Sequence, residues 1–298
     1  MRRSVTLIAV ALLVATRSFS ADGKPKIYLS VDMEGISGIV HGDQVSSDSR
    51  EYPATRRWMA DDVNAVIAGL LAAGAGEIVV NDSHGSMRNL SPEDLRPEAT
   101  LISGATKPLG MMAGIDATFA ACIFVGYHAE AGSSPAILDH TISGGTVHSV
   151  SVNGVEMPEL GLNAALAGSY GVPVIMLSGD AAACGQATAL LGNGVVTVAV
   201  KQALNRTAAM LLPLTEARKR LEQGSREALL RLPRLKPFRL TPPFEFSVSF
   251  QNSGQADIGE WIPGVTRSAP RTLTYTTPDF PAGVRLLAVL INLGANRS

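Results

Sequence analysis

Apolar residues in this chain fall into short continuous runs separated by longer amphipathic stretches. The runs at 27–31, 77–80 and 121–125 are typical of buried parallel strands, because such strands are covered on both faces. Between the first two runs, residues 57–73 repeat apolar side chains at helical spacing. This alternation of strand and helix predicts an α/β fold: a mainly parallel sheet flanked by helices, with right-handed crossovers.

The same patterns predict the remaining elements. Strands are expected at 100–102, 149–152, 173–177 and 195–200, and helices at 159–169, 181–191, 202–211 and 216–232. The polar segment 43–51 predicts a mobile loop beside the end of the first strand. Four prolines within 233–243 indicate a boundary, beyond which strands at 244–250 and 272–276 and a helix at 281–293 are expected. The sequence therefore predicts an α/β core over 21–232 and a smaller C-terminal α/β portion over 233–298.

Side chains that can bind metals follow the predicted strands where each strand ends. Asp32 and Glu34 come directly after the first strand, and in an extended backbone residues two apart point the same way. His84 and His128 follow two further strands, and Glu159 opens a predicted helix. Ligands of open α/β sheets bind outside the carboxyl ends of the strands. Because carboxylates and imidazoles bind catalytic metals, and a carboxylate can bridge two of them, these residues predict a metal site.

Each of these residues alone also fits a role without a metal. The two acids after the first strand fit a solvated turn, the two histidines fit hydrogen-bonded structural positions, and Glu159 fits a favourable charge at a helix start. Asp82 fits either an acceptor behind His84 or the start of an Asx turn. His140, in a Gly/Ser-rich stretch, fits either a proton shuttle or a residue without function. The joint placement at one sheet edge favours a site, because chance would scatter these residues over both ends.

Composition and charge exclude several function classes. The 298 residues are 46% hydrophobic, enough for a substantial core, and the formal net charge is −1. A nucleic-acid-binding surface would need a clustered basic face, and the aromatic content of 5% argues against base stacking. The sequence contains neither a G-x-S-x-G elbow nor a Walker loop. His41 and His148 are expected to be structural or exposed.

The N-terminal residues carry an export pattern. A basic start, an apolar stretch over 5–15 and small residues before Ala21 predict a cleavable signal peptide over 1–20. The alternative is an uncleaved anchor, but the stretch is shorter than the roughly 20 residues of a membrane span. The mature protein is expected in the periplasm or outside the cell, with no stable membrane association. Cys122 and Cys184 could pair there, but their apolar surroundings favour two buried free thiols.

Several segments resemble, in the same order, blocks of the binuclear-zinc D-aminopeptidases, a family typified by the enzyme of the bacterial dipeptide-permease operon. The resemblance runs from Lys26 to the C-terminus. The blocks are Ser30-Val31-Asp32-Met33-Glu34-Gly35-Ile36-Ser37-Gly38, Asn81-Asp82-Ser83-His84, Leu101-Ile102-Ser103-Gly104, Gly126-Tyr127-His128-Ala129, Glu159-Leu160-Gly161-Leu162-Asn163-Ala164, Lys201-Gln202, Gly254-Gln255-Ala256-Asp257 and Pro263-Gly264.

The resemblance implies a metallopeptidase that removes N-terminal D-residues from short peptides, with two Zn²⁺ per subunit. The implied zinc ligands are Asp32, Glu34, His84, His128 and Glu159. Asp32 would bridge the ions, with Glu34 and His128 completing one site and His84 and Glu159 the other. His140 matches the family's catalytic histidine. The resemblance also implies a homodecamer of stacked five-membered rings, and we expect the C-terminal portion to supply intersubunit surface.

The chain departs from the family pattern in three places. The spacer between His128 and His140 is one residue longer than in the type enzyme, and Pro158 stands where glycine is expected. The export signal shifts the expected substrates to wall-derived peptides, such as D-Ala-containing di- and tripeptides. The motifs do not set the choice between D- and L-residues, because pocket walls decide it. Two alternatives remain at this point: a two-metal amidase or phosphatase, and a non-catalytic periplasmic peptide-binding protein.

Overall fold

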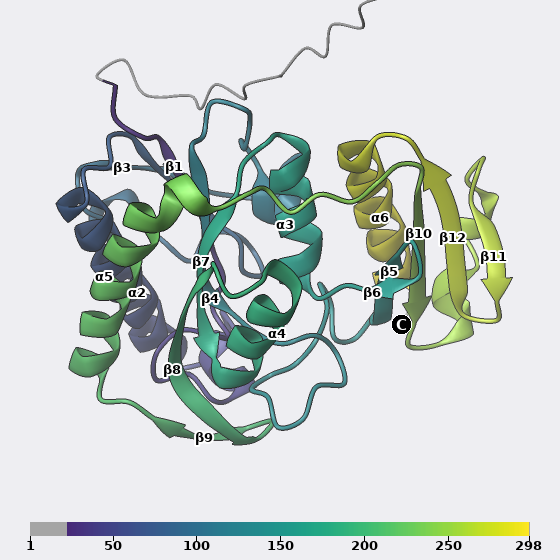
Figure 1. Cartoon of the computed structure of the whole chain (residues 1–298). Helices are drawn as coiled ribbons and strands as arrows, with labels where there is room; N and C mark the ends of the chain where they lie inside the picture. Colours follow the sequence, from purple (N-terminus) through teal and green to yellow (C-terminus); the bar gives the residue numbers. More distant parts are fainter. Residues whose placement is uncertain (1–22, 298) are drawn as a thin grey trace, which may run out of the picture.

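The computed structural model describes residues 23–297, so the predicted signal peptide lies outside the described residues. A seven-stranded sheet in the order β3-β2-β1-β4-β7-β8-β9 forms its centre (Figure 1). Its strands are β1 (Ile27–Val31), β2 (Ile78–Asp82), β3 (Ala99–Ile102), β4 (Ala121–Tyr127), β7 (Val174–Asp180), β8 (Val196–Asn205) and β9 (Ala208–Leu211). All neighbouring pairs are parallel except β8 with β9, which confirms the predicted mainly parallel sheet.

Helices cover both faces of this sheet. The helices α2 (Tyr52–Ala72) and α5 (Leu214–Arg231) lie on one face, and α3 (Glu159–Ser169) and α4 (Ala181–Leu191) lie on the other (Figure 1). In β1, Leu29 joins the apolar cluster of α2 and α5, whereas Tyr28 joins the cluster of α3 and α4. Because both faces of the strand are buried, its sequence is a continuous apolar run.

A second, antiparallel sheet has the order β11-β12-β10-β5-β6. Its strands are β5 (Val147–Val152), β6 (Val155–Glu156), β10 (Phe244–Phe250), β11 (Thr266–Ala269) and β12 (Thr272–Thr277), and α6 (Phe280–Ala295) packs on it. The apolar cluster of α3 and α4 continues into this sheet. Because β5 and β6 come from the segment predicted to belong to the core, the predicted boundary at residue 232 does not coincide with the division between the sheets.

One local prediction was wrong, and another holds only over part of its length. Residues 202–211, expected to form a helix, complete β8 and form β9, joined by a turn in which the Asn205 side chain accepts from the Thr207 N–H at 2.8 Å. In β8, Ala203 is buried while Gln202 and Leu204 are exposed, the period-two alternation of a strand. The loop expected at 43–51 contains the short helix α1 (Gly42–Val45), and buried Gln44 accepts from the backbone N–H groups of residues 40 and 41.

The two cysteines lie in the interior of the protein. Cys122 and Cys184 are buried and unpaired, which confirms the prediction of free thiols. Among residues 23–297, no helix has both the length and the apolar character that a membrane span needs.

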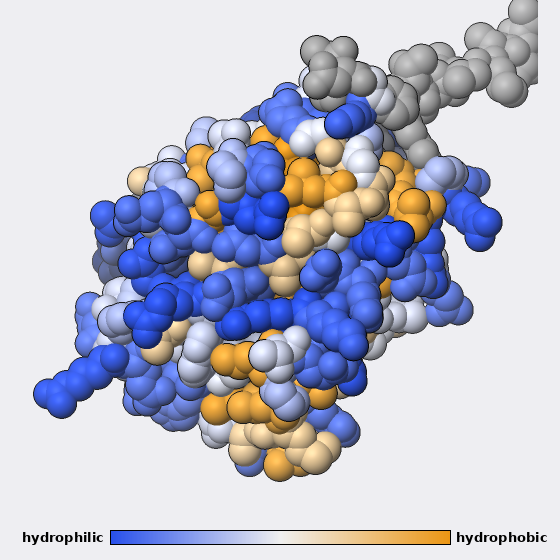
Figure 2. All heavy atoms as spheres, turned by 90° about the vertical axis from the view of Figure 1, so that its left-hand side faces the viewer, coloured by the Kyte–Doolittle hydropathy of each residue, from blue (hydrophilic) through white to orange (hydrophobic). Residues whose placement is uncertain are grey.

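Hydrophobic residues gather at the lower end of the face in Figure 2, where Figure 1 places β9. Exposed Leu204, Met210 and Leu211 belong to this β8–β9 hairpin.

Candidate metal centre

Three neighbouring strands bring the predicted ligands to one edge of the sheet. β1 lies between β2 and β4, and Val31 is in register with Asp82 on one side and Val125 on the other. The pairing continues past the strand ends, because the Asp32 N–H donates to the Val125 carbonyl at 2.8 Å. The side chains that follow these strands therefore emerge at one level. Helix α3 begins at Glu159 directly after Pro158, so proline in place of glycine leaves the helix start intact.

Close backbone contacts fix the loop that carries the two acids. The Gly35 N–H donates to the Gly126 carbonyl at 2.8 Å. A Cβ at position 35 would lie 2.1 Å from the Tyr127 carbonyl oxygen, so only glycine permits this approach. From β8, the buried Lys201 ammonium donates to the carbonyls of Glu34, Ile36 and Ile39 at 2.6, 2.9 and 2.6 Å.

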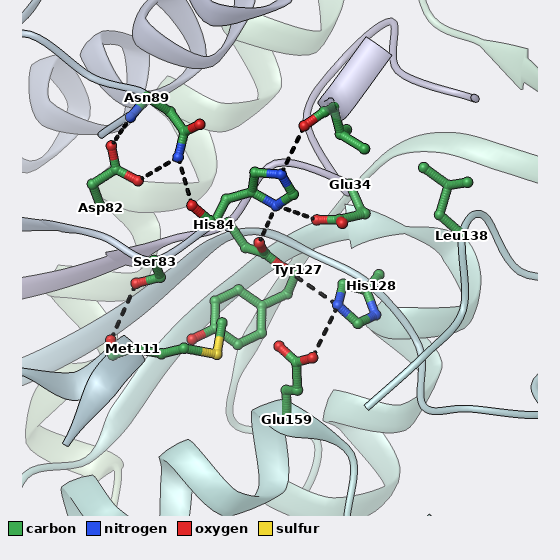
Figure 3. A network of polar contacts seen from close by, with 12 residues as sticks. Glu34, Asp82, Ser83, His84, Asn89, Met111, Tyr127, His128, Leu138 and Glu159 are labelled. Atoms are coloured by element: carbon green, nitrogen blue, oxygen red, sulfur yellow. Dashed lines mark hydrogen bonds and ion pairs between the residues drawn. The ribbon is translucent and has the colours of Figure 1, made fainter. Parts of the chain in front are cut away.

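The predicted ligands lie in direct contact, with Asp32 between two histidines. Figure 3 shows Glu34 beside His84 and Glu159 beside His128. His84 Nδ1 is 3.3 Å from Asp32 Oδ1 and 3.0 Å from Glu34 Oε2. His128 Nε2 is 3.4 Å from Asp32 Oδ2 and 3.3 Å from Glu159 Oε1. The shortest side-chain contacts thus join His84 to Glu34 and His128 to Glu159, and Asp32 lies against both histidines.

Each histidine of the centre is oriented by a backbone carbonyl. The ring atom facing away from the carboxylates is 3.0 Å from the Val45 oxygen in His84, 2.9 Å from the Ala129 oxygen in His128 and 2.9 Å from the Leu138 oxygen in His140. When each of these outer nitrogens donates its hydrogen, the inner nitrogen presents a lone pair to the site.

The loop that carries His84 is fixed by Asp82. The Asp82 carboxylate accepts from the backbone N–H groups of Asn89 and Leu90 at 2.5 and 2.7 Å, and the Asn89 amide donates in turn to the His84 carbonyl at 2.8 Å (Figure 3). Asp82 therefore shapes the loop, and its carboxylate makes its hydrogen bonds with Asn89 and Leu90.

His140 reaches the centre despite the longer spacer. Its ring stacks on that of His128, with centroids 4.0 Å apart and an interplanar angle of 14°. His140 Nε2 lies 3.7 Å from Glu159 Oε1, and its side chain is 19% exposed against 2% for His128. His140 is thus the solvent-facing member of the stacked pair. His41 caps α1 and His148 is exposed on β5, as expected.

A family model for D-aminopeptidases matches residues 26–289, nearly the whole described chain. The chain belongs to the D-aminopeptidase family. It is 40% identical over 276 residues to a D-aminopeptidase of Bacillus subtilis (strain 168), covering 92% of this chain and 99% of that relative. Among solved structures it resembles the Zn-dependent D-aminopeptidase DppA from Bacillus subtilis, a self-compartmentalizing protease. The TM-score is 0.88 at 38% identity, over 92% of this chain and 99% of that one.

The centre of this D-aminopeptidase family member fits a cation. Among the described residues, Asp32 Oδ2 and His128 Nε2 are buried without a hydrogen-bond partner, although they face each other at 3.4 Å. Such unpaired buried groups cost about 1–3 kcal/mol each, so an ion held between them would remove a large penalty. Ligand atoms of Asp32, Glu34 and His128 converge within 4.8 Å, as do those of His128, His140 and Glu159. Carboxylate oxygens with imidazole nitrogens are a zinc donor set.

Burial and neighbouring charges shift the pKa values of the groups in the centre. Burial raises the pKa of Asp32 to about 6, and the Glu34 carboxylate adds to this rise. Burial lowers the pKa of His128, but Glu159 and Asp32 outweigh it and raise that pKa to about 10. For His84, too, Glu34 and Asp32 overcome burial and raise the pKa well above its usual range. The neighbouring carboxylates therefore favour the cationic form of both imidazoles, and a bound metal ion would supply that positive charge in its place.

Sequence reasoning missed the residues that support the centre. Lys201 was predicted only to belong to a block that resembles the family. Its place at the end of an apolar strand is the signal that could have identified a buried charge. The Ser30 hydroxyl bonds the Tyr127 hydroxyl at 2.7 Å, and the Asn163 amide donates to that hydroxyl at 2.9 Å. Asn163 lies one helical turn after Glu159, so this network ties α3 to the sheet beneath the site.

Proposed function

We propose that this protein is a zinc-dependent aminopeptidase that removes N-terminal D-residues from short peptides. The observation that carries the proposal is the position of Asp32, whose two carboxylate oxygens face His84 on one side and His128 on the other. A carboxylate in this position suits a bridge between two metal ions. Membership in the D-aminopeptidase family supports this function over a phosphatase or a non-catalytic binding protein.

We assign the two ions by the family resemblance and by the convergence of ligand atoms. Glu34 and His128 would complete one zinc site with Asp32, and His84 and Glu159 would complete the other. The convergence of the Asp32, Glu34 and His128 ligand atoms within 4.8 Å supports the first of these groups. This arrangement supports two zinc ions per subunit, because each group adds one carboxylate and one imidazole to Asp32.

The residues of the chain would then divide the reaction between them. Bound zinc supplies Lewis-acid chemistry that polarises a peptide carbonyl and makes water nucleophilic near neutral pH. His140 Nε2 faces the centre from its solvent side, and its other nitrogen is held by the Leu138 carbonyl. His140 is thereby placed to give a proton to the leaving amine or to stabilise the oxyanion. The buried carboxylates also attract the free amino group of the peptide.

Export and enclosure are further parts of the proposal. The N-terminal pattern supports release into the periplasm or outside the cell, where short D-Ala-containing peptides from cell wall would be substrates. Mass spectrometry of the native protein tests this, because signal cleavage removes about twenty residues. The self-compartmentalizing relative supports a closed oligomer, which we propose to be a decamer of stacked pentameric rings that admits only short or unfolded peptides.

One set of assays tests the function. Purified protein is analysed for metals and incubated with D-Ala and L-Ala p-nitroanilides and with p-nitrophenyl phosphate. We expect bound zinc and preferential hydrolysis of the D-Ala compound, with no turnover of the phosphate ester. Preferential turnover of the ester would identify a phosphatase. Protein that takes up no transition metal on dialysis and hydrolyses neither anilide would support the binding-protein alternative.

A further inference from the structure

Ile142 has an unusual backbone conformation for its residue type. Its φ is 65°, in the left-handed region, where a β-branched residue is a true outlier. Its side chain is also 41% exposed, so burial in the core does not offset the strain. Glycine or asparagine would adopt this conformation at lower cost, and the same segment does contain glycines at 144 and 145. Backbone strain of this kind is concentrated at functional sites.

Ile142 adjoins the metal centre directly. Its backbone N–H donates to Glu159 Oε1 at 2.5 Å, and the same oxygen lies 3.3 Å from His128 Nε2. This bond explains the local backbone path, but any residue except proline would supply the same N–H. The bond therefore does not account for an exposed isoleucine side chain at this position.

Ile142 lies beside the most exposed histidine of the centre. Asp32, Glu34, His128 and Glu159 are only 3%, 6%, 2% and 4% exposed. The His84 side chain is 13% exposed, and the His140 side chain, two residues from Ile142, is 19% exposed. The His140 segment thus borders the most open approach to the ligands, and its exposed apolar side chain is Ile142.

We propose that Ile142 is a specificity-determining residue that contacts the side chain of the peptide's N-terminal residue and favours apolar side chains there. This inference rests on the proposed aminopeptidase function. In an aminopeptidase the first carbonyl is attacked at the metal centre. The Cβ of the first residue is two bonds from that carbon, whereas the Cβ of the second residue is three bonds away. The first side chain is thus the variable group held nearest to the ligands.

The test compares substrates that differ only in the first side chain. Values of kcat/KM are measured for the p-nitroanilides of glycine, D-Ala and D-Leu with the wild type, Ile142→Ala and Ile142→Asn. Asparagine tolerates the left-handed conformation and keeps a side chain of similar size but polar character. We expect both variants to lose about tenfold or more in the ratio of D-Leu to glycine turnover, because missing methylene contacts change selectivity by this order. Zinc content should stay at the wild-type level, and any loss on glycine should be much smaller than the loss on D-Leu.

Val155→Ala is the matched control, since Val155 is also β-branched, is 53% exposed and lies on β6 in the other sheet. It should leave all ratios unchanged. An equal loss on glycine, D-Ala and D-Leu would assign Ile142 a purely structural role and overturn the inference. A change in oligomer size by light scattering with unchanged ratios would also overturn it, in favour of a subunit contact. A wild type that hydrolyses none of the anilides would refute the proposed function itself.

Discussion

At the scale of single residues, Asp32 is the group on which the centre depends, because among residues 23–297 it alone contacts both His84 and His128. We expect Asp32→Ala to lose most of both zinc ions, since a bridging ligand serves two sites at once. Elemental analysis after dialysis measures this loss. Asp43→Ala, which removes an exposed carboxylate near the same loop, should retain the metal. Full zinc content in Asp32→Ala would show that this carboxylate does not bridge.

His140 differs from the ligands because neither proposed zinc site needs it. Its solvent-facing ring stacks on that of His128. We expect His140→Ala to lower kcat by about 10²–10⁴, the usual contribution of an acid–base group, with zinc content intact. Steady-state kinetics on D-Ala p-nitroanilide provides the measurement. His148→Ala, which removes an exposed histidine on β5, is the control. Turnover near the wild-type level would remove His140 from the mechanism.

The pKa shifts of the metal-free centre predict proton release on zinc binding. The pKa of His128 is raised to about 10, so its imidazole is protonated at pH 8 before a metal binds, and the pKa of His84 is shifted in the same direction. Zinc binds only the deprotonated nitrogen, so metal uptake must release the His128 proton. Calorimetry in buffers of different ionisation enthalpy measures this release. His128→Asn should release fewer protons, and uptake without release at pH 8 would contradict the raised values.

The ligands could be predicted from the sequence because each one directly follows a strand or opens a helix. Parallel strands place all such positions at one edge, so the topology alone groups them. Lys201 could not be predicted as a partner of the Glu34 loop. Its acceptors are main-chain carbonyls more than a hundred residues away in sequence, and carbonyls have no residue-type signature.

At the scale of elements, Lys201 joins β8 to the loop that follows β1. We expect Lys201→Met to lower the free energy of unfolding by about 1–3 kcal/mol, because three buried carbonyls lose their donor. Zinc retention should also weaken, since that loop carries Asp32 and Glu34. Urea unfolding and competition with a chelator measure the two effects.

Ser225→Ala separates loop positioning from general destabilisation. The buried Ser225 hydroxyl donates to the Val66 carbonyl at 2.9 Å and ties α5 to α2. This variant should lose stability but keep its zinc affinity. If both variants lower stability equally and neither alters zinc affinity, Lys201 has no role in positioning the ligand loop.

Elements with one clear period were predicted correctly, and ambiguous ones were not. Continuous apolar runs such as β1 and β4 are too short for a typical helix, so their length indicates strands. Residues 202–211 mix apolar and polar side chains in a way that suits either period, and their state is decided by pairing with the sheet edge. Tertiary contact of this kind overrides local propensity.

At the scale of the whole molecule, one apolar cluster connects the two sheets through α3. The linear order of the sequence suggested a separate C-terminal portion, because prolines gather at 233–243. In the structure, β5 and β6 precede this boundary in sequence but belong to the same sheet as the C-terminal strands. Sequence patterns mark where elements end, but they do not state which distant strands pair. The helix that carries Glu159 is thereby supported from both sheets.

The C-terminal sheet and α6 supply none of the predicted ligands, which leaves their surface available for subunit contact. Trp261 is 75% exposed and Val289 is 48% exposed in this portion. We expect light scattering to show a large closed oligomer of the 31.1 kDa chain. Trp261→Ser should shift the protein towards smaller species, because exposed tryptophans are frequent anchors of interfaces.

Leu230→Ser is the control for that experiment, since Leu230 is 63% exposed on α5, outside the C-terminal portion. It should leave the oligomer intact. If the wild type is a monomer with full activity on dipeptides, the enclosure of the sites is refuted while the zinc chemistry stands. If Leu230→Ser dissociates the assembly and Trp261→Ser does not, the subunit contact lies on the helical face of the large sheet instead.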